Sequence, residues 1–235
     1  MSTVIAAPSP INVPVAGTND TFPVRHVYCV GRNYAEHTKE MGGDTKEPPF
    51  FFTKAADAIV PVVPPAVGEI AYPLATKSLH HEIELVVAIG QSGVRLAPEQ
   101  ANKVIYGYAV GLDMTRRDLQ GQMKEKRWPW DVGKSFAQAA PISPIHPVTK
   151  TGVLSKGAIW LDVNGTRRQQ GDLADMIWDV PHMLHFLSQY YELMPGDLIF
   201  TGTPAGVNAV VPGDKLVGGV DGVDTLAVTI VEARW

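Results

Sequence analysis

Cysteine is almost absent from this sequence, and its scarcity excludes two classes of protein. The 235 residues include one cysteine, Cys29, so the chain has neither an intramolecular disulfide framework nor a zinc site built from cysteine thiolates. Cys29 lies in the apolar run 27–30, which is typical of a buried strand, and we interpret it as a structural thiol rather than a reactive one. The chain is long enough to rely on a hydrophobic core instead.

Long apolar runs and a strong net charge are also missing. No segment approaches the roughly 18 apolar residues that span a bilayer, and the N-terminus lacks the basic start of a signal peptide. A net charge of −4 gives no general attraction to nucleic acids or anionic membranes. Basic residues gather at 116–117 and 124–127, but acidic residues interrupt them, which fits a small-anion pocket better than a phosphate-binding stripe. We therefore expect a cytoplasmic protein with neither nucleic-acid nor membrane partners.

Many short β-prone segments with few helices between them make up most of the chain. Strands are expected at 25–30, 82–89, 106–113, 198–201, 215–217 and 226–231. The pair Asn164-Gly165 predicts a hairpin with a type I′ turn. The clearest helix is expected over 180–191, and a shorter one over 34–41. This pattern predicts a strand-rich α+β fold.

Three carboxylates occur beside apolar segments, where ionised groups are costly. Glu82 and Glu84 precede the apolar run 85–89, and Asp113 ends the run 106–112. Because side chains alternate along a strand, the two glutamates point to one face, with Cα atoms about 6.6 Å apart. Like charges there repel unless a cation neutralises them, and a hard divalent metal is the simplest one. The alternative is a solvent-facing edge strand, but the unalternating run is typical of a buried one, which favours a metal site and an enzyme.

Other polar residues have two interpretations each. His37 and Glu40 lie three apart in the expected helix, so Glu40 can polarise the imidazole as a general base requires, although a solvated histidine gives the same pattern. Lys134, between a glycine and an apolar segment, is either a surface charge or a group that neutralises an oxyanion. Residues 201–204 are either a turn or a set of backbone amides and a hydroxyl facing a carboxylate.

Taken together, these segments resemble the fumarylacetoacetate hydrolase family over roughly residues 23 to 230. The resemblance is carried by Val30-Gly31-Arg32-Asn33-Tyr34 with His37, His81-Glu82-Ile83-Glu84, Gly111-Leu112-Asp113 through Gln120, Lys134-Ser135-Phe136 and Thr201-Gly202-Thr203-Pro204-Ala205-Gly206-Val207. Their shared order along the chain argues against a chance match. Within the family, the segments 22–52 and 115–120 are most similar to the bacterial fumarylpyruvate hydrolases.

The resemblance implies a mixed β-roll or sandwich fold, usually in a homodimer. Residues 1–22 are rich in Pro, Ala, Ser, Thr and Gly, which predicts an N-terminal extension and leaves 23–235 as the catalytic domain. The resemblance implies that Glu82, Glu84 and Asp113 bind Mg²⁺ or Mn²⁺. It also implies that His37 and Glu40 activate water, on a helix that in relatives can close over the ligand.

The resemblance further implies a substrate of the dicarboxylic diketo acid class. The positions that would hold its carboxylate and keto oxygens are Arg117, Gln120, Lys134 and Thr203. Relatives often carry aspartate after the Lys-Ser-Phe segment, where this chain has Ala137, so the support of Lys134 is left open.

The implied reaction is hydrolysis of a carbon–carbon bond in a 2,4-diketo acid, with fumarylpyruvate giving fumarate and pyruvate in gentisate-type aromatic breakdown. The alternatives on the same scaffold are decarboxylation of oxaloacetate or another 2-oxo acid, hydration of a dienoate and general acylpyruvate hydrolysis. A more distant alternative is a non-catalytic protein that binds small anions.

Overall fold

The computed structural model describes residues 3–6, 9–40 and 47–233, without the side chains of residues 38–40. The strands are β1 (Asn12–Pro14), β2 (Thr21–Pro23), β3 (His26–Gly31), β4 (Phe50–Lys54), β5 (Ile59–Pro61), β6 (Gly68–Ala71), β7 (Leu79–His80), β8 (Ile83–Ile89), β9 (Ile105–Leu112), β10 (Thr115–Arg116), β11 (Ala140–Ile142), β12 (His146–Pro147), β13 (Ala158–Val163), β14 (Thr166–Asp172), β15 (Asp197–Phe200), β16 (Ala209–Val210), β17 (Lys215–Val220) and β18 (Thr225–Val231). The helices are α1 (Ala35–Glu40), α2 (Pro98–Ala101), α3 (Arg117–Lys126), α4 (Asp131–Lys134), α5 (Val148–Thr151) and α6 (Val180–Tyr190), with 3₁₀ turns η1 (Ala56–Ala58), η2 (Asn102–Val104) and η3 (Leu173–Asp175).

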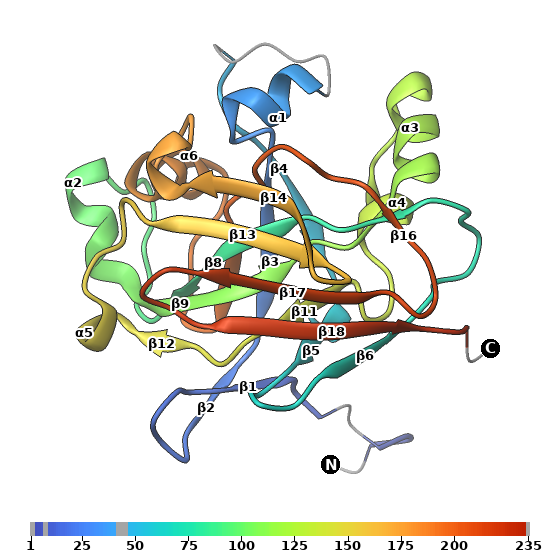
Figure 1. The fold of residues 1–235 in the computed structure, drawn as a ribbon. Coiled ribbons are helices and arrows are strands. Elements are labelled where there is room, and N and C mark those ends of the chain that lie inside the picture. The colour runs from blue at the N-terminus through green and yellow to red at the C-terminus, as the bar shows by residue number, and fades with distance from the viewer. Residues whose placement is uncertain (1–2, 7–8, 41–46, 234–235) are drawn as a thin grey trace.

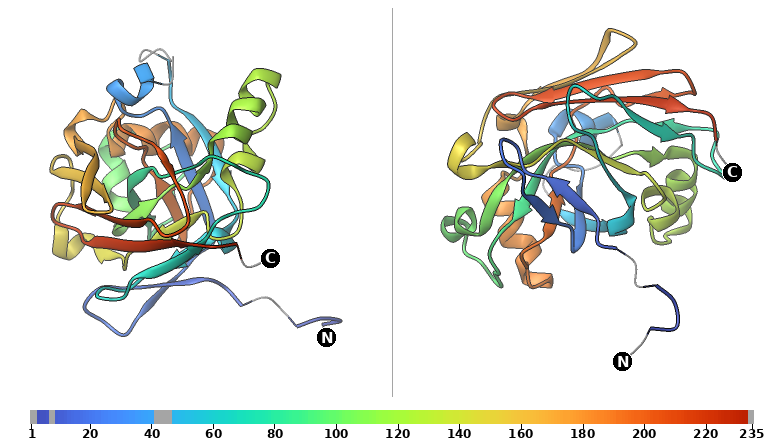
Figure 2. Two further views of the ribbon diagram at one scale, coloured as in Figure 1. Left: turned by 45° about the vertical axis from the view of Figure 1, so that its right-hand side comes forward. Right: turned by 90° about the horizontal axis from the view of Figure 1, so that it is seen from below.

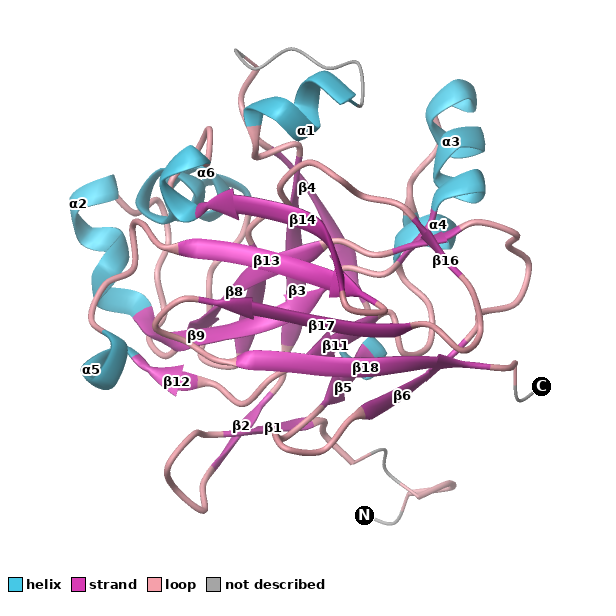
Figure 3. Ribbon diagram, in the orientation of Figure 1, coloured by secondary structure: helices cyan, strands magenta, loops and turns pink. Residues whose placement is uncertain are grey.

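Two sheets form the body of the protein. A five-stranded sheet has the order β14-β13-β17-β18-β6 and lies at the front of Figure 1. An eight-stranded sheet behind it has the order β4-β3-β15-β8-β9-β11-β5, with β12 paired to β9, and is mixed because β3–β15 and β5–β11 are parallel. Figure 2 shows the two layers from below, and Figure 3 shows the helices at the margins of the strands. The predicted strand-rich α+β fold is confirmed.

Strand β8 supplies side chains to two separate apolar clusters. Ile83, Leu85 and Val87 lie in the core cluster that includes residues of the five-stranded sheet. Val86 and Ala88 lie in the second cluster, on the opposite face of the strand. Every residue of β8 is buried, so the strand is covered on both faces, as its unalternating composition predicts.

Local signals in the sequence are confirmed at three positions. The β13–β14 hairpin turns at Asn164 and Gly165, whose φ angles of 52° and 76° are the left-handed pair of a type I′ turn. Helix α6 begins after Asp179, whose carboxylate accepts a hydrogen bond from the backbone N–H of His182 at 3.0 Å. Cys29 is fully buried, and burial raises the pKa of its thiol.

Residues 12–23 form a hairpin below the main body in Figure 1. Strands β1 and β2 pair in antiparallel fashion, and Val13 and Phe22 are buried in the second apolar cluster. The assignment of residues 1–22 as an N-terminal extension and of 23–235 as the catalytic domain stays a prediction. Across the described residues, no helix combines the length and the apolar composition needed to cross a bilayer.

Candidate active site

The register between β8 and β9 brings the three carboxylates together. Glu82 directly precedes β8 and Asp113 directly follows β9, and the backbone N–H of Asp113 donates to the carbonyl of Glu82 at 2.8 Å. Glu84 lies opposite Gly111, so alternation places all three side chains on one face of the sheet. One carboxylate oxygen from each lies within 4.8 Å of the others, and each residue is at most 4% exposed. The buried carboxylate cluster predicted from the sequence is therefore present.

Three cationic side chains surround this cluster. Lys134 Nζ donates to Glu82 Oε2 at 2.7 Å and to Asp113 Oδ2 at 2.6 Å, and Arg117 forms an ion pair with Glu82. Lys54 Nζ lies 2.8 Å from Asp113 Oδ1. Lys134 is therefore not a surface charge, and the two carboxylates give it support that does not depend on Ala137.

The cations do not compensate the carboxylates equally. Burial alone would raise the pKa of Glu82, but the charges of Lys134 and Arg117 outweigh it and hold that pKa below its usual range. Burial raises the pKa of Glu84 well above its usual range, and the carboxylates of Asp113 and Glu82 raise it further. Glu84 accepts a hydrogen bond from the Gly202 backbone N–H at 2.7 Å. A divalent cation among these oxygen donors would supply the positive charge that Glu84 lacks, so the residues fit a hard metal ion.

Lys54 is a site residue that the sequence analysis missed. It ends the aromatic strand β4, is 3% exposed, and donates to the backbone carbonyl of Met114 at 3.2 Å and to that of Lys134. It thereby ties the residue after Asp113 to the last residue of α4. The signal was a lysine two residues after three consecutive phenylalanines, where a charged side chain needs a buried partner.

Gln169 is the second residue that was missed. It lies on β14 of the other sheet and is fully buried. Its Oε1 accepts from the backbone N–H of Ile83 at 3.1 Å, and its Nε2 donates to Thr203 Oγ1 and to the Pro204 carbonyl, both at 2.8 Å. The Thr203 hydroxyl in turn donates to the carbonyl of Ile83 at 2.7 Å. Gln169 thus ties the start of β8 to the segment that carries Thr203.

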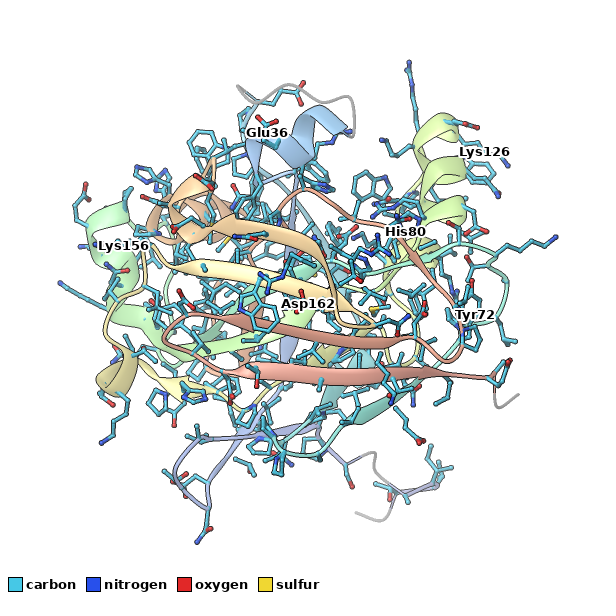
Figure 4. The ribbon with its side chains drawn as sticks, in the orientation of Figure 1. Glu36, Tyr72, His80, Lys126, Lys156 and Asp162 are labelled. Atoms are coloured by element: carbon cyan, nitrogen blue, oxygen red, sulfur yellow. The ribbon has the colours of Figure 1, made fainter. Side chains whose placement is uncertain are left out.

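One pocket joins the three carboxylates and Lys134 to other residues predicted from the sequence. His37, on α1, is 6% exposed and faces the pocket, and Arg117 Nη1 donates to Gln120 Oε1 at 2.6 Å. The side chain of Glu40 lies outside the described part of the structure. The pocket is lined by Val30, Gly31, Arg32, His37, Phe52, Glu82, Glu84, Asp113, Arg117, Gln120, Lys124, Trp130, Lys134, Gly202 and Thr203. In Figure 4, the labelled His80 comes from β7, the strand that leads toward Glu82.

Comparison with known proteins identifies the family of this chain. Residues 26–231 match the fumarylacetoacetate (FAA) hydrolase C-terminal family. The fumarylpyruvate hydrolase of a Ralstonia species is 46% identical over 188 residues, which cover 80% of this chain and 95% of that protein. The mitochondrial oxaloacetate decarboxylase of Dictyostelium discoideum is 40% identical over 201 residues, covering 86% and 91%.

A solved structure is similar over nearly the whole chain. The fumarylpyruvate hydrolase of Pseudomonas aeruginosa, in complex with Mn²⁺ and pyruvate, superposes with a TM-score of 0.97 at 50% identity. The match covers 98% of this chain and all of that one. The chain belongs to the fumarylacetoacetate hydrolase family and is an enzyme, a hydrolase that acts on carbon–carbon bonds.

Proposed function

We propose that this enzyme hydrolyses a carbon–carbon bond of a 2,4-diketo acid, with fumarylpyruvate as the substrate and fumarate and pyruvate as products. The observation that carries the proposal is the buried cluster of Glu82, Glu84 and Asp113, which shares one pocket with His37 and Lys134. The two similar fumarylpyruvate hydrolases support this choice of substrate. The pathway would be gentisate-type breakdown of aromatic compounds.

The three carboxylates are proposed to hold Mg²⁺ or Mn²⁺. A divalent ion there would act as a Lewis acid toward neighbouring substrate oxygens. The oxygen donor set suits both ions, and Mn²⁺ is the metal in the similar Pseudomonas structure. Lys134 Nζ, which already lies between Glu82 and Asp113, would neutralise charge on a substrate oxygen next to them.

Each of the remaining residues is proposed to have one role in the reaction. His37, oriented by Glu40, would take a proton from water as its oxygen adds to the carbonyl carbon of the acyl group. The carbon–carbon bond then breaks, its electron pair leaves with the pyruvate enolate beside Lys134, and that enolate takes up a proton. Arg117 and Gln120 would bind the pyruvyl carboxylate, with Thr203 beside them.

Replacing His37 by alanine should lower kcat for fumarylpyruvate by about 100- to 10,000-fold, because the water would lose its general base. The loss of fumarylpyruvate absorbance with Mg²⁺ present measures the rate. His182→Ala is the matched control, because this histidine is exposed on α6 and pairs with Asp179 away from the pocket. Near wild-type turnover in His37→Ala would show that the proposed base is wrong.

Two further reactions are candidates on the same scaffold. One is decarboxylation of oxaloacetate, and the other is general acylpyruvate hydrolysis. Both pass through an enolate of the kind that Lys134 would stabilise, and the similar Dictyostelium protein is an oxaloacetate decarboxylase. Decarboxylation needs no attacking water, so His37 in the pocket favours hydrolysis. A panel of acylpyruvates and oxaloacetate, compared by kcat/KM, separates these two reactions from hydrolysis of fumarylpyruvate.

We also propose a homodimer in the cytoplasm. Strand β4 lies at the edge of its sheet, and the aromatic residues Tyr190 and Tyr191 beside it are 71% and 44% exposed. Covering such a patch with a second copy would remove apolar surface from water. Sedimentation equilibrium should give twice the mass of one chain, and a single-chain mass at micromolar concentration would contradict the dimer.

A further inference from the structure

The side-chain amide of Gln169 can have only one orientation. Its Oε1 accepts from the backbone N–H of Ile83 at 3.1 Å, and its Nε2 donates to the Pro204 carbonyl at 2.8 Å. Exchanging the amide nitrogen and oxygen would break both of these contacts. The second donor of Nε2 therefore goes to Thr203 Oγ1 at 2.8 Å, and His81 Nδ1, which lies 2.8 Å from Oε1, must carry a proton. Gln169 is buried and does not line the pocket, so any role in the reaction is through the groups it holds.

The hydroxyl of Thr203 has no proton left for a substrate. Its one hydrogen is donated to the carbonyl of Ile83 at 2.7 Å, while the Gln169 amide donates to its oxygen. Turning the hydroxyl toward the pocket would take this donor away from the buried Ile83 carbonyl, which is costly. A carboxylate oxygen of a substrate only accepts hydrogen bonds, so this hydroxyl cannot serve it while Gln169 holds the oxygen.

The backbone N–H of Thr203 is the donor that remains. Among the described residues no hydrogen bond uses it, although Thr203 is 2% exposed and lines the pocket that holds the three carboxylates. Buried backbone N–H groups are almost always paired, so an unused one at a pocket points to a ligand. The preceding N–H, that of Gly202, already donates to Glu84 Oε2 at 2.7 Å in the same pocket.

The chain around Thr203 is held from more than one side. The Asn33 side chain donates to the carbonyl of Thr201 at 2.8 Å. Gly202 has a φ angle of 95°, and a Cβ there would lie 2.7 Å from the Cβ of Asn33, so this turn requires glycine. Gln169 reaches the segment from β14, in the front sheet of Figure 1, whereas the segment follows β15 of the sheet behind it. Without Gln169 the turn would remain, but the contact that sets the place of Thr203 would be lost.

We propose that Gln169 is a positioning residue for the reaction: it holds the Thr203 hydroxyl so that the backbone N–H of Thr203, and not the hydroxyl, donates to an oxygen of the pyruvyl carboxylate. The inference rests on the proposed function, in which Arg117 and Gln120 bind that carboxylate. Thr203 lines the same pocket as these two residues. A backbone donor fixed on a turn loses no rotamer freedom on binding, in contrast to a hydroxyl that must reorient.

The direct test follows backbone amides by NMR in isotope-labelled wild-type protein with Mg²⁺, as pyruvate is added. The Thr203 amide should shift downfield, and its exchange with solvent should slow by about 10-fold or more, because it gains a charge-assisted hydrogen bond. The Gly202 amide is the internal control, since it already donates to Glu84, and its exchange should change less than about threefold. A Thr203 amide that does not respond to pyruvate would overturn the proposal.

Substitutions test the link between Gln169 and Thr203. Gln169→Met should raise the Kd for pyruvate and the KM for fumarylpyruvate by about 10-fold each, while kcat changes less than about threefold. Thr203→Val keeps the N–H but loses the hydroxyl, so its effect should be of similar size, and the double variant should be no worse than either single one. Gln189→Met is the control, because Gln189 is exposed on α6 and donates to the His185 carbonyl of its own helix at 3.1 Å.

Binding through the hydroxyl would give a different pattern. Gln169→Met would then free the Thr203 proton and leave pyruvate affinity unchanged or higher, which would overturn the proposal, as would losses that add in the double variant. The amide titration needs only wild-type protein, so it decides the donor even if a variant does not fold. If wild type did not cleave fumarylpyruvate, the proposed reaction would be wrong, and the response of the Thr203 amide to pyruvate would still decide this inference.

Discussion

Replacing Glu84 by glutamine should weaken Mn²⁺ binding and lower kcat/KM for fumarylpyruvate by at least about 100-fold each. Glutamine keeps the size of the side chain and can still accept the hydrogen bond from Gly202, so the fold should survive. Glu84 is the informative carboxylate because Glu82 and Asp113 also form ion pairs with lysine or arginine side chains. Calorimetric titration with Mn²⁺ measures the first effect.

The control for Glu84→Gln is Asp162→Asn, which removes a carboxylate from β13 without touching the pocket. Asp162, labelled in Figure 4, forms an ion pair with Arg167 on the five-stranded sheet. It should leave both Mn²⁺ affinity and turnover unchanged. Mn²⁺ affinity of Glu84→Gln equal to that of wild type would remove the metal assignment, whatever the effect on rate.

Elements that depend on local chemistry could be predicted from the sequence. The Asn164-Gly165 turn needs only its own left-handed residues, and α6 needs only Asp179 and its apolar face. The burial of β8 on both faces could also be predicted, because an unbroken apolar run has no face that suits water. From these elements follow the strand-rich class and the interpretation of Glu82 and Glu84 as a costly pair.

The partners of that pair could not be predicted from local chemistry. Asp113 lies beside Glu82 because of the register in which β9 pairs with β8. That register depends on two separate segments of the chain, so neither segment predicts it alone. Lys54 reaches the site from the end of β4 and Gln169 from the middle of β14, and the local sequence does not say which buried groups they contact. Their roles follow from burial and from the hydrogen bonds they make, which only the assembled sheets define. The family resemblance predicted the metal ligands and the catalytic residues. The structure adds Lys54 and Gln169, which hydrogen-bond to the backbone around them.

The second large effect is expected at Lys54. Lys54→Met should lower the free energy of unfolding by about 3 kcal/mol, because the buried carboxylate of Asp113 loses a cation while its cost of burial remains. The backbone carbonyl of Met114 also loses a donor. Urea denaturation without divalent metal measures the difference, and m should be unchanged.

The double variant Lys54→Met with Asp113→Asn tests the cause. Removing the charge of Asp113 removes the reason for the penalty, so the double variant should be more stable than Lys54→Met alone, by about 1–2 kcal/mol. Addition of Mn²⁺ should stabilise Lys54→Met, where the metal would replace the missing charge, and should not stabilise the double variant, which lacks a ligand. If the two losses simply added, Lys54 would stabilise the fold through its backbone contacts and not through Asp113. The carboxylate cluster would then depend on Lys134 and Arg117 alone for its compensation.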